Sequence, residues 1–551
     1  MLWQKIHNSL ASFKNLKDKK YMPFLLMVFF AIAFFSTRLP RLANDIINPD
    51  AVLWHIRSEQ FVVGLKYGQF EKTYQHYHPG VTLMWIIGSS VEVFKQITGI
   101  NVYTSETYMS FDLVAKSALV LVQFILTLLI ILNLAKLTGF YKSFLVTSIF
   151  TFEPFFLGNS RILHLDVLST LLVLLALVFL FQNLQKPKLI RSVLVGLFLA
   201  LAFLTKSICI GAFIYGLFYS VFYLLLLKDK KNIVKVVVPM FISFIAFTFL
   251  FFPALWGDPK YYMIDMIFKE GQRVGMEDGH RQVLMGELTN NGGVFFYLLI
   301  FLIKSSPFML LGVLLSVYYY IKKSLKPVLK SPKKILNKFT GFGLYLCIFY
   351  LGYILFMTVA SKKIDRYLIM LFPFFAYTSY YGYKNLLYTA KKVGYVKYYK
   401  VVMTFLVFIF ILIPTFRIFP WYFTYVSPVI GNTVRANKII GQKSFGVGIP
   451  DLKKTILQRY YNMYGEEPLL GFYDTQPMRA IYPNSKIFDV RVYGPGNYDL
   501  LVLTMNESMP DKVLNDPKYE LKKDYSIYIN GLEYWRIYIK FPLRDTVNGK
   551  E

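Results

Sequence analysis

Long uncharged apolar runs follow one another over the first 420 residues of the chain. Runs of about 17–25 apolar residues are long enough to cross a lipid bilayer as helices. The pattern predicts eleven membrane-spanning helices, near residues 22–37, 113–134, 142–157, 165–183, 190–206, 209–227, 233–253, 306–321, 340–359, 367–386 and 401–419. We therefore expect an α-helical polytopic membrane protein.

Two connections between the predicted spans are much longer than the others, 38–112 and 254–305. The first contains the stretch from Asn48 to Trp85, which carries charged groups together with many aromatic side chains. Segments of this kind favour the bilayer surface. The second has turn residues around short amphipathic pieces. We expect amphipathic helices in both connections, folded over one face of the membrane.

After Pro420 the pattern changes to short apolar runs separated by turns. Strands are predicted at 469–474, 486–490, 498–504 and 525–540, after a helix near 451–463. The last run contains Asn530-Gly531 between alternating residues, which is a hairpin signal. The chain thus divides into a membrane domain, 1–420, and a soluble α/β domain, 421–551.

The net charge of +29 suggests a nucleic-acid partner at first sight, but its distribution favours another explanation. The segments expected on one side of the membrane hold 26 Lys and Arg residues against two acids, Asp18 and Asp229. Such asymmetry follows the positive-inside rule. We therefore expect a plasma-membrane protein in contact with lipid and not with nucleic acid, with a cytoplasmic N-terminus and an extracytoplasmic C-terminal domain. The span after the basic residues 1–20 has no cleavage pattern and is interpreted as a retained helix.

Cysteine and histidine usage offers little support for a metal or disulfide site. The two cysteines, Cys209 and Cys347, each lie inside an apolar run, so a disulfide framework is not expected. Four histidines fall in predicted outer segments without the helical spacing typical of zinc ligands: His76, His78, His164 and His280. No cofactor is predicted, and a divalent metal has no support in the pattern. The chain also lacks a P-loop and a dinucleotide-binding motif in a suitable context.

Asp50 is the first candidate for chemistry. It follows Asn48-Pro49 and precedes a helical pattern, so it is either the N-cap of that helix, a functional carboxylate, or both. Arg161 and Asp166 flank a short turn between two spans, where ionisable groups either line a site or pair with each other. Lys206 lies at a predicted outer helix end and is either part of the site or a snorkelling side chain.

A cluster of cations departs from the charge rule. Lys362, Lys363 and Arg366 stand together on the side of the membrane where Lys and Arg should be sparse. They predict a bound anion, because guanidinium groups hold phosphate oxygens in a bidentate manner. The alternative is a cluster that faces lipid headgroups.

Several motifs together resemble the protein O-mannosyltransferase-like family (glycosyltransferase family 39) of GT-C membrane glycosyltransferases, in its prokaryotic form. The resemblance covers most of residues 22–420. It rests on Asp50, on the His78-Pro79-Gly80 turn, and on the motifs SRILHLD (160–166), GDPKYY (257–262), GHRQVLMGE (279–287) and SKKIDRYLIMLFP (361–373). One position departs from the family pattern, since Ala51 stands where a glutamate is common.

The resemblance implies inverting transfer of a mannose-like hexose from a polyprenyl-phosphate donor to an acceptor hydroxyl on the outer face. The acceptor belongs to a protein, a lipid or a glycan. Asp50 would be the catalytic base, while Arg161, Lys362, Lys363 and Arg366 would bind the donor phosphate. His78, Asp166, Lys206 and His280 are further substrate-site candidates.

Two other classes of function compete with the transferase. A transporter or flippase for a lipid-linked or anionic substrate would show a two-sided cavity between symmetric halves. A nonenzymatic scaffold would leave the cation cluster unexplained. A lipid-facing groove that leads to a cavity near Asp50, Arg161 and Arg366 would favour the transferase.

Overall fold

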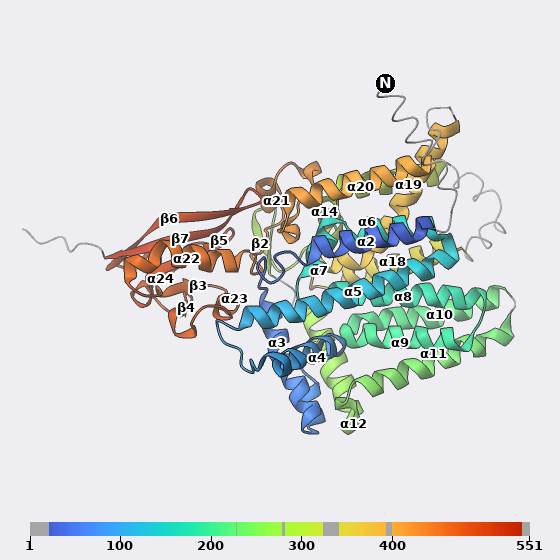
Figure 1. The fold of residues 1–551 in the computed structure, drawn as a ribbon, viewed down its shortest axis with the longest axis horizontal. Helices are drawn as coiled ribbons and strands as arrows, with labels where there is room; N and C mark the ends of the chain where they lie inside the picture. Colours follow the sequence, from blue (N-terminus) through green and yellow to red (C-terminus); the bar gives the residue numbers. More distant parts are fainter. Residues whose placement is uncertain (1–20, 228, 278–280, 323–340, 393–398, 543–551) are drawn as a thin grey trace, which may run out of the picture.

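The computed structural model describes residues 21–227, 229–277, 281–322, 341–392 and 399–542. The basic residues 1–20 and most of the predicted basic loop 322–338 lie outside this range. Within it, a large helical bundle is joined at one end to a smaller domain built on a sheet (Figure 1).

Every predicted span coincides with a helix or a pair of helices. The predicted span 142–157 falls on two helices, α6 and α7, which are separated at Phe152-Glu153. The bundle consists of α2 (Tyr21–Arg38), α5 (Tyr108–Thr138), α6 (Phe140–Thr151), α7 (Pro154–Arg161), α8 (Asp166–Gln185), α9 (Leu189–Thr205), α10 (Ile210–Leu226), α11 (Lys230–Phe251), α15 (Pro307–Tyr320), α18 (Phe342–Val359), α19 (Phe372–Lys392) and α20 (Tyr399–Ile418).

By length and apolar composition, six helices in the described part of the chain can cross a membrane: α2, α5, α8, α11, α18, and α10 with its preceding turn. Two further apolar helices, α9 and α15, have 17 and 14 residues and are shorter than a typical span. The predicted fold class, a polytopic helical membrane protein with a C-terminal α/β domain, is confirmed.

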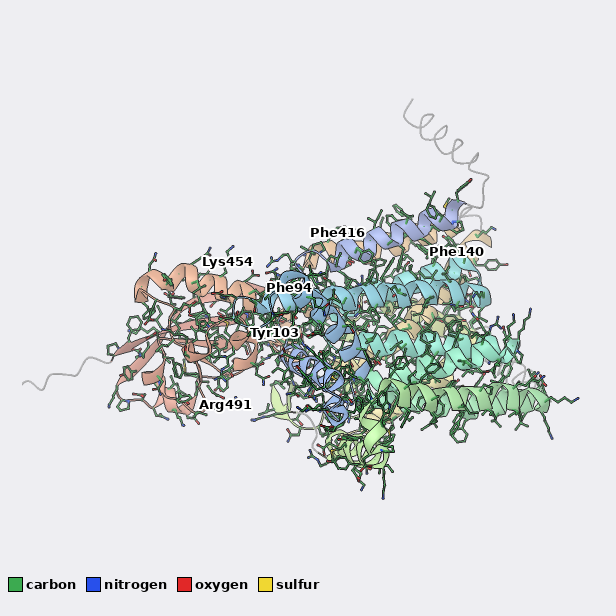
Figure 2. All side chains as sticks on the ribbon, turned by 60° about the horizontal axis from the view of Figure 1, so that its bottom comes forward. Phe94, Tyr103, Phe140, Phe416, Lys454 and Arg491 are labelled. Atoms are coloured by element: carbon green, nitrogen blue, oxygen red, sulfur yellow. The ribbon has the colours of Figure 1, made fainter. Side chains whose placement is uncertain are left out.

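Helix α8 is the central element of the bundle. Its apolar window is 94% buried, because α5, α9 and α10 pack around it. Asp166 begins this helix, so the central element carries a charged residue at one end. Exposed aromatic side chains such as Phe416 project from the outside of the bundle, whereas Lys454 and Arg491 lie on the surface of the sheet domain (Figure 2).

The first long connection forms two helices, α3 (Pro49–Lys66) and α4 (Val81–Thr98), with a 3-10 turn η1 (Phe70–Thr73) between them. The second contains strands that the sequence pattern did not predict. Its elements are α12 (Ala254–Gly257), the π-helical η3 (Tyr261–Lys269), α13 (Glu270–Gln272), η4 (Arg273–Glu277), the antiparallel strands β1 (Gln282–Leu284) and β2 (Glu287–Thr289), and α14 (Phe296–Lys304).

The C-terminal sheet has the strand order β4-β3-β5-β7-β6. Strand β3 is parallel to both β4 and β5, and β7 is antiparallel to both β5 and β6. The strands are β3 (Leu470–Phe472), β4 (Ile487–Asp489), β5 (Leu500–Thr504), β6 (Tyr519–Ile529) and β7 (Leu532–Pro542), and the helices are α21 (Thr433–Ile439), α22 (Ile449–Tyr464), α23 (Thr475–Arg479) and α24 (Asp511–Leu514). The predicted hairpin is confirmed, with Asn530 and Gly531 both at positive φ in the turn.

A strap of residues 439–448 joins this domain to the bundle. Ile440 forms a bridge with Leu284 of β1, and Val447 forms one with Ile46 just before α3. The indole of Trp535 in β7 donates to the carbonyl of Val447. The two long connections and the sheet domain therefore meet at the same end of the bundle (Figure 1).

Candidate functional site

Asp50 lies in the first turn of α3, at the end of the bundle that carries the sheet domain. The N-cap of α3 is Asn48, so the interpretation of Asp50 as the cap is wrong. Its Oδ2 atom lies 3.2 Å from Nε2 of His164 and 3.3 Å from an Arg366 nitrogen. Burial alone would raise the pKa of Asp50, but the contacts with His164 and Arg366 outweigh it and hold the pKa well below its usual range. Asp50 is therefore a carboxylate at neutral pH.

His164 connects Asp50 to a second acid. It lies in the turn between α7 and α8, and its Nδ1 atom is 2.8 Å from Oδ2 of Asp166. The other oxygen of Asp166 accepts a hydrogen bond of 2.5 Å from the ammonium of Lys206. That ammonium lies 4.0 Å from the ring centre of Tyr367. Asp50, His164, Asp166 and Lys206 thus form a contact series of alternating acidic and basic groups.

His164 is the functional candidate that sequence reasoning missed as a site residue. The sequence pattern offers it only as a metal ligand, although it stands within the SRILHLD motif between Arg161 and Asp166. A basic residue two positions before a buried acid was the available signal. Only the fold shows that its second nitrogen reaches Asp50.

The His78-Pro79-Gly80 turn packs against the start of η2 (Ser207–Cys209). Nδ1 of His78 lies 2.9 Å from the Ser207 hydroxyl, and burial holds the pKa of His78 well below its ordinary value. Gly80 has a φ of +62°, and a Cβ there would come within 2.1 Å of the Trp54 ring of α3. Only glycine fits this position, so the turn fixes α4 against α3 and places His78 beside Lys206.

The predicted cation cluster separates into three environments. Lys362 donates to the hydroxyl of Tyr77 at 3.2 Å, and Lys363 turns away to donate to the carbonyl of Ala360. Arg366 contacts Asp50 and lies over the ring of Phe445, 4.3 Å from its centre. Lys362 and Arg366 therefore face the site, whereas the Lys363 ammonium bonds within its own loop.

The structure places Arg161 away from this cluster. Its Nε donates to Asp45 at 2.8 Å, and its other nitrogens donate to the backbone carbonyls of Thr37, Arg38 and Pro40. This fully buried guanidinium holds the end of α7 against the end of α2, so its contacts are structural and differ from the predicted phosphate contact. Neither alternative partner, Asp166 or Glu153, pairs with it; Glu153 instead accepts hydrogen bonds from Ser306 at the start of α15.

Ala51 is fully buried in α3, packed in the core of the bundle. A glutamate here would have to enter that core or displace α3. His280 lies outside the described residues. Within the described ranges no group of three or more His, Cys, Asp or Glu side chains could hold a metal ion.

Three hollows lie around the contact series. The first, the cationic cavity, has a volume of about 320 Å³ and carries Tyr77, His78, Lys206, Lys362 and Tyr367 among apolar side chains. Burial raises the pKa of Tyr77 to about 12, so its hydroxyl stays protonated and can donate.

The second hollow, the apolar groove, has about 350 Å³ and runs between α10 and α18. It shares Ile208, Ile210, Tyr353 and Phe356 with the cationic cavity, so the two hollows adjoin each other. Ile214 and Phe356 in its wall are 46% and 51% exposed, which opens the groove on the apolar surface of the bundle.

The third hollow, the interdomain cavity, has about 470 Å³ and lies between the bundle and the sheet domain. Asp50 and Arg366 line it, together with residues of the strap and of the sheet domain. Asp50, at one end of the contact series, lines the interdomain cavity, and Lys206, at the other end, lines the cationic cavity. The neighbours Arg366 and Tyr367 likewise line one cavity each, so the series lies between the two.

Comparisons with known proteins give similarity in backbone course only. No family profile and no curated protein matches the chain. Among solved structures, it is similar to ArnT from Cupriavidus metallidurans bound to undecaprenyl phosphate, at 12% identity over 97% of this chain and 100% of that one, with a TM-score of 0.46. The apo state of the same protein gives 12% identity over 94% and 97%, with a TM-score of 0.47.

The oligosaccharyltransferase of Archaeoglobus fulgidus, tethered to an acceptor peptide, matches at 14% identity over 84% of this chain and 63% of that one, with a TM-score of 0.44.

Proposed function

We propose that the protein transfers a sugar from a polyprenyl-phosphate-linked donor to an acceptor hydroxyl, at the outer face of the membrane, with inversion at the anomeric carbon. One observation carries this proposal: a single series of charged contacts, from Asp50 to Lys206, lies between a polar cavity and a cationic cavity that adjoins an apolar groove.

The cationic cavity and the apolar groove fit the two parts of such a donor. A phosphate monoanion or diester needs cations and hydroxyl donors, which Lys206, Lys362 and Tyr77 supply. A polyprenyl chain needs a long apolar surface in contact with the lipid phase, which the groove between α10 and α18 supplies. The Lys206 ammonium donates one of its three N–H groups to Asp166, so two N–H groups can donate to a ligand.

Asp50 and Arg366 line the cavity on the other side, where an acceptor would enter. The acceptor oxygen attacks the anomeric carbon while the bond from that carbon to the phosphate oxygen breaks. The bonding electrons leave with the polyprenyl phosphate, and the acceptor proton passes to the carboxylate of Asp50. Arg366 and His164 keep Asp50 ionised and oriented between turnovers. One base and one phosphate site are sufficient, and no second carboxylate nucleophile is required.

The family resemblance adds a mannose-like hexose as the transferred sugar. The transporter alternative lacks a comparable supporting observation. A carrier requires its charged groups in a passage that opens alternately to both sides. Here Asp50 and Arg366 line a cavity shared with the sheet domain, and Lys206 belongs to the same contact series through Asp166 and His164.

Replacement of the base tests the proposal directly. With purified protein in nanodiscs and radiolabelled polyprenyl-phosphate hexose, Asp50→Asn should lower the transfer rate by about 10²–10⁴-fold and leave donor binding intact. Glu106→Gln, an exposed acid in the same connection, is the matched control and should keep full activity. Full transfer by folded Asp50→Asn would show that Asp50 is not the base.

A further inference from the structure

The interdomain cavity is built from three separate parts of the chain. The membrane domain contributes Asp50 and Arg366, the second long connection contributes Lys304, and the sheet domain contributes Asp474 and Glu507. The sheet domain is therefore part of the cavity wall, because the cavity would be open on one side without its side chains.

Polar contacts fix the walls of this cavity. Lys304 is 2% exposed. Its ammonium donates to the side chain of Gln442 at 2.7 Å and to the carbonyl of Tyr425 at 3.2 Å. Asn506 donates to the carbonyl of Gln442 at 2.7 Å, which ties the strap to the end of β5. The cavity is thus a pre-formed site whose polar groups are held in place.

Asp474 stands at the start of α23, the helix that packs against α3. Glu507 follows β5, and one of its oxygens accepts the backbone N–H of Thr504. Both carboxyl groups line the cavity with Asp50, and burial raises the pKa of each of the two. The sheet domain therefore presents hydrogen-bond acceptors toward the proposed base.

The lining combines acceptors, donors and rings. Carboxylates accept hydrogen bonds, ammonium groups donate them, and side-chain amides do both. Phe423 and Phe445 stack at 5.2 Å between ring centres and form an apolar wall beside these groups. A ligand that suits such a wall has many hydroxyl groups, each able to donate and accept, together with an apolar ring face. Sugars have this chemistry.

A peptide acceptor suits the cavity less well. One common way for an extended peptide to bind is to pair with a free strand edge. The edge strands of the sheet, β4 and β6, contribute no residue to the cavity. The β5 residue that lines it, Thr504, pairs with Trp535 of β7 and donates its N–H to the Glu507 side chain. Strand β1 pairs with β2 on one edge and with the strap at Ile440 and Gly441 on the other.

We propose that the interdomain cavity binds a glycan as the acceptor, and that Asp474 and Glu507 of the sheet domain select it. This inference rests on the proposed sugar transfer at Asp50. It gives the C-terminal domain a defined role, which is to position a sugar hydroxyl beside the base.

Binding to the full-length protein in nanodiscs tests the inference without requiring turnover. Saturation-transfer NMR would use a panel of methyl oligosaccharides, built from neutral hexoses, N-acetylated amino sugars or uronic acids, next to an unglycosylated Ser/Thr-rich peptide. At least one oligosaccharide should bind the wild-type protein. Asp474→Asn and Glu507→Gln, which are nearly isosteric, should each weaken that binding by about tenfold. The control Glu520→Gln, an exposed acid on β6, should have no effect.

Native mass spectrometry of the same samples with polyprenyl phosphate separates the two proposals. Suppose that polyprenyl phosphate is retained. The glycan inference is then overturned, and the donor site stands, if only the peptide binds, if no probe binds, or if oligosaccharide binding is unchanged by both substitutions. Oligosaccharide binding that depends on Asp474 and Glu507, without retention of polyprenyl phosphate, supports the cavity as a glycan site and overturns the proposed donor.

Discussion

At the scale of single residues, Arg161 and Arg366 show that charge and location in the chain do not determine a role. Both were predicted to bind the donor phosphate, yet Arg161 is surrounded by Asp45 and three backbone carbonyls, while Arg366 contacts Asp50. Arg161 is also fully buried, so its removal would leave Asp45 as a buried unpaired charge.

We therefore expect Arg161→Gln to lower the free energy of unfolding by about 3–5 kcal/mol, without altering the KM for the donor. Thermal unfolding in detergent and donor kinetics of the folded fraction measure the two effects. Arg435→Gln, at an exposed arginine of α21, should change neither. If Arg161→Gln had normal stability and a raised KM for the donor, Arg161 would have to bind the donor phosphate.

Two half-buried histidines predict how stability depends on pH. Burial lowers the pKa of His76 to about 4 and that of His78 well below 6.5. Below pH 6.5 the unfolded chain therefore binds protons that the folded protein does not, and stability falls as the pH falls, by up to about 1.4 kcal/mol per pH unit for each histidine.

Unfolding of the wild-type protein at pH 7.5 and 5.5 should show this loss, and His78→Asn should reduce it. Ser207→Ala serves as the control, because it removes the hydrogen-bond partner of His78 and keeps the titrating ring. An equal loss of stability in wild-type protein and in His78→Asn would contradict the assignment.

Several ionisable residues that the sequence singles out lie together in the structure, but the sequence does not predict their contacts. Asp50, Asp166, Lys206 and Arg366 stand out because charged groups at helix ends near apolar runs are costly and conspicuous. The link through His164 could not be predicted, because it joins the start of α3 to a turn more than a hundred residues later. Hydrophobic periodicity carries no information on such long-range geometry.

At the scale of elements, strong apolar runs predicted helices well, and the Asn530-Gly531 turn predicted its hairpin. Strands β1 and β2 were missed, because each has three residues and their order comes from pairing with each other and, for β1, with the strap, not from a local pattern. The groove between α10 and α18 likewise arises from packing. Small residues in its wall, Gly211 and Gly352, leave space that no single helix reveals.

A bulky side chain in that groove should compete with a lipid tail. A Cβ at Gly352 would meet no atom within 4 Å, so Gly352→Trp can be accommodated while it fills the groove. We expect the KM for a long-chain polyprenyl-phosphate donor to rise by roughly tenfold, which corresponds to about 1.4 kcal/mol of binding.

A donor with a truncated lipid should be affected much less by Gly352→Trp. Leu355→Trp, on the exposed face of the same helix, is the matched control and should leave both KM values unchanged. If Gly352→Trp behaved like Leu355→Trp, the lipid tail would have to lie elsewhere.

At the scale of the whole molecule, the site depends on how the sheet domain is seated on the bundle. The strap and the segment before α3 exchange backbone hydrogen bonds, with Ile47 donating to Gly446 at 3.1 Å and Gly448 donating to Asp45 at 2.7 Å. Asp50 follows directly, so the same contacts that hold the domain also set the position of the proposed base. Sequence patterns predicted the two domains but gave no indication of this seam.

Gly446 is where the seam can be tested. It has a φ of +71°, and a Cβ there would lie 1.7 Å from the carbonyl oxygen of Ile47, so Gly446→Ala must push the strap away from α3. We expect transfer activity to fall at least tenfold, the difference that about 1.4 kcal/mol makes, because the base moves relative to both cavities. Limited proteolysis should release the sheet domain faster, while polyprenyl phosphate stays bound at the cationic cavity.

Gly465→Ala is the matched control. Gly465 has a φ of +70° at the end of α22 with no atom within 4 Å of a Cβ, so this substitution reproduces the backbone strain without the collision. Equal activity and equal proteolysis of the two variants would mean that the seam does not position Asp50.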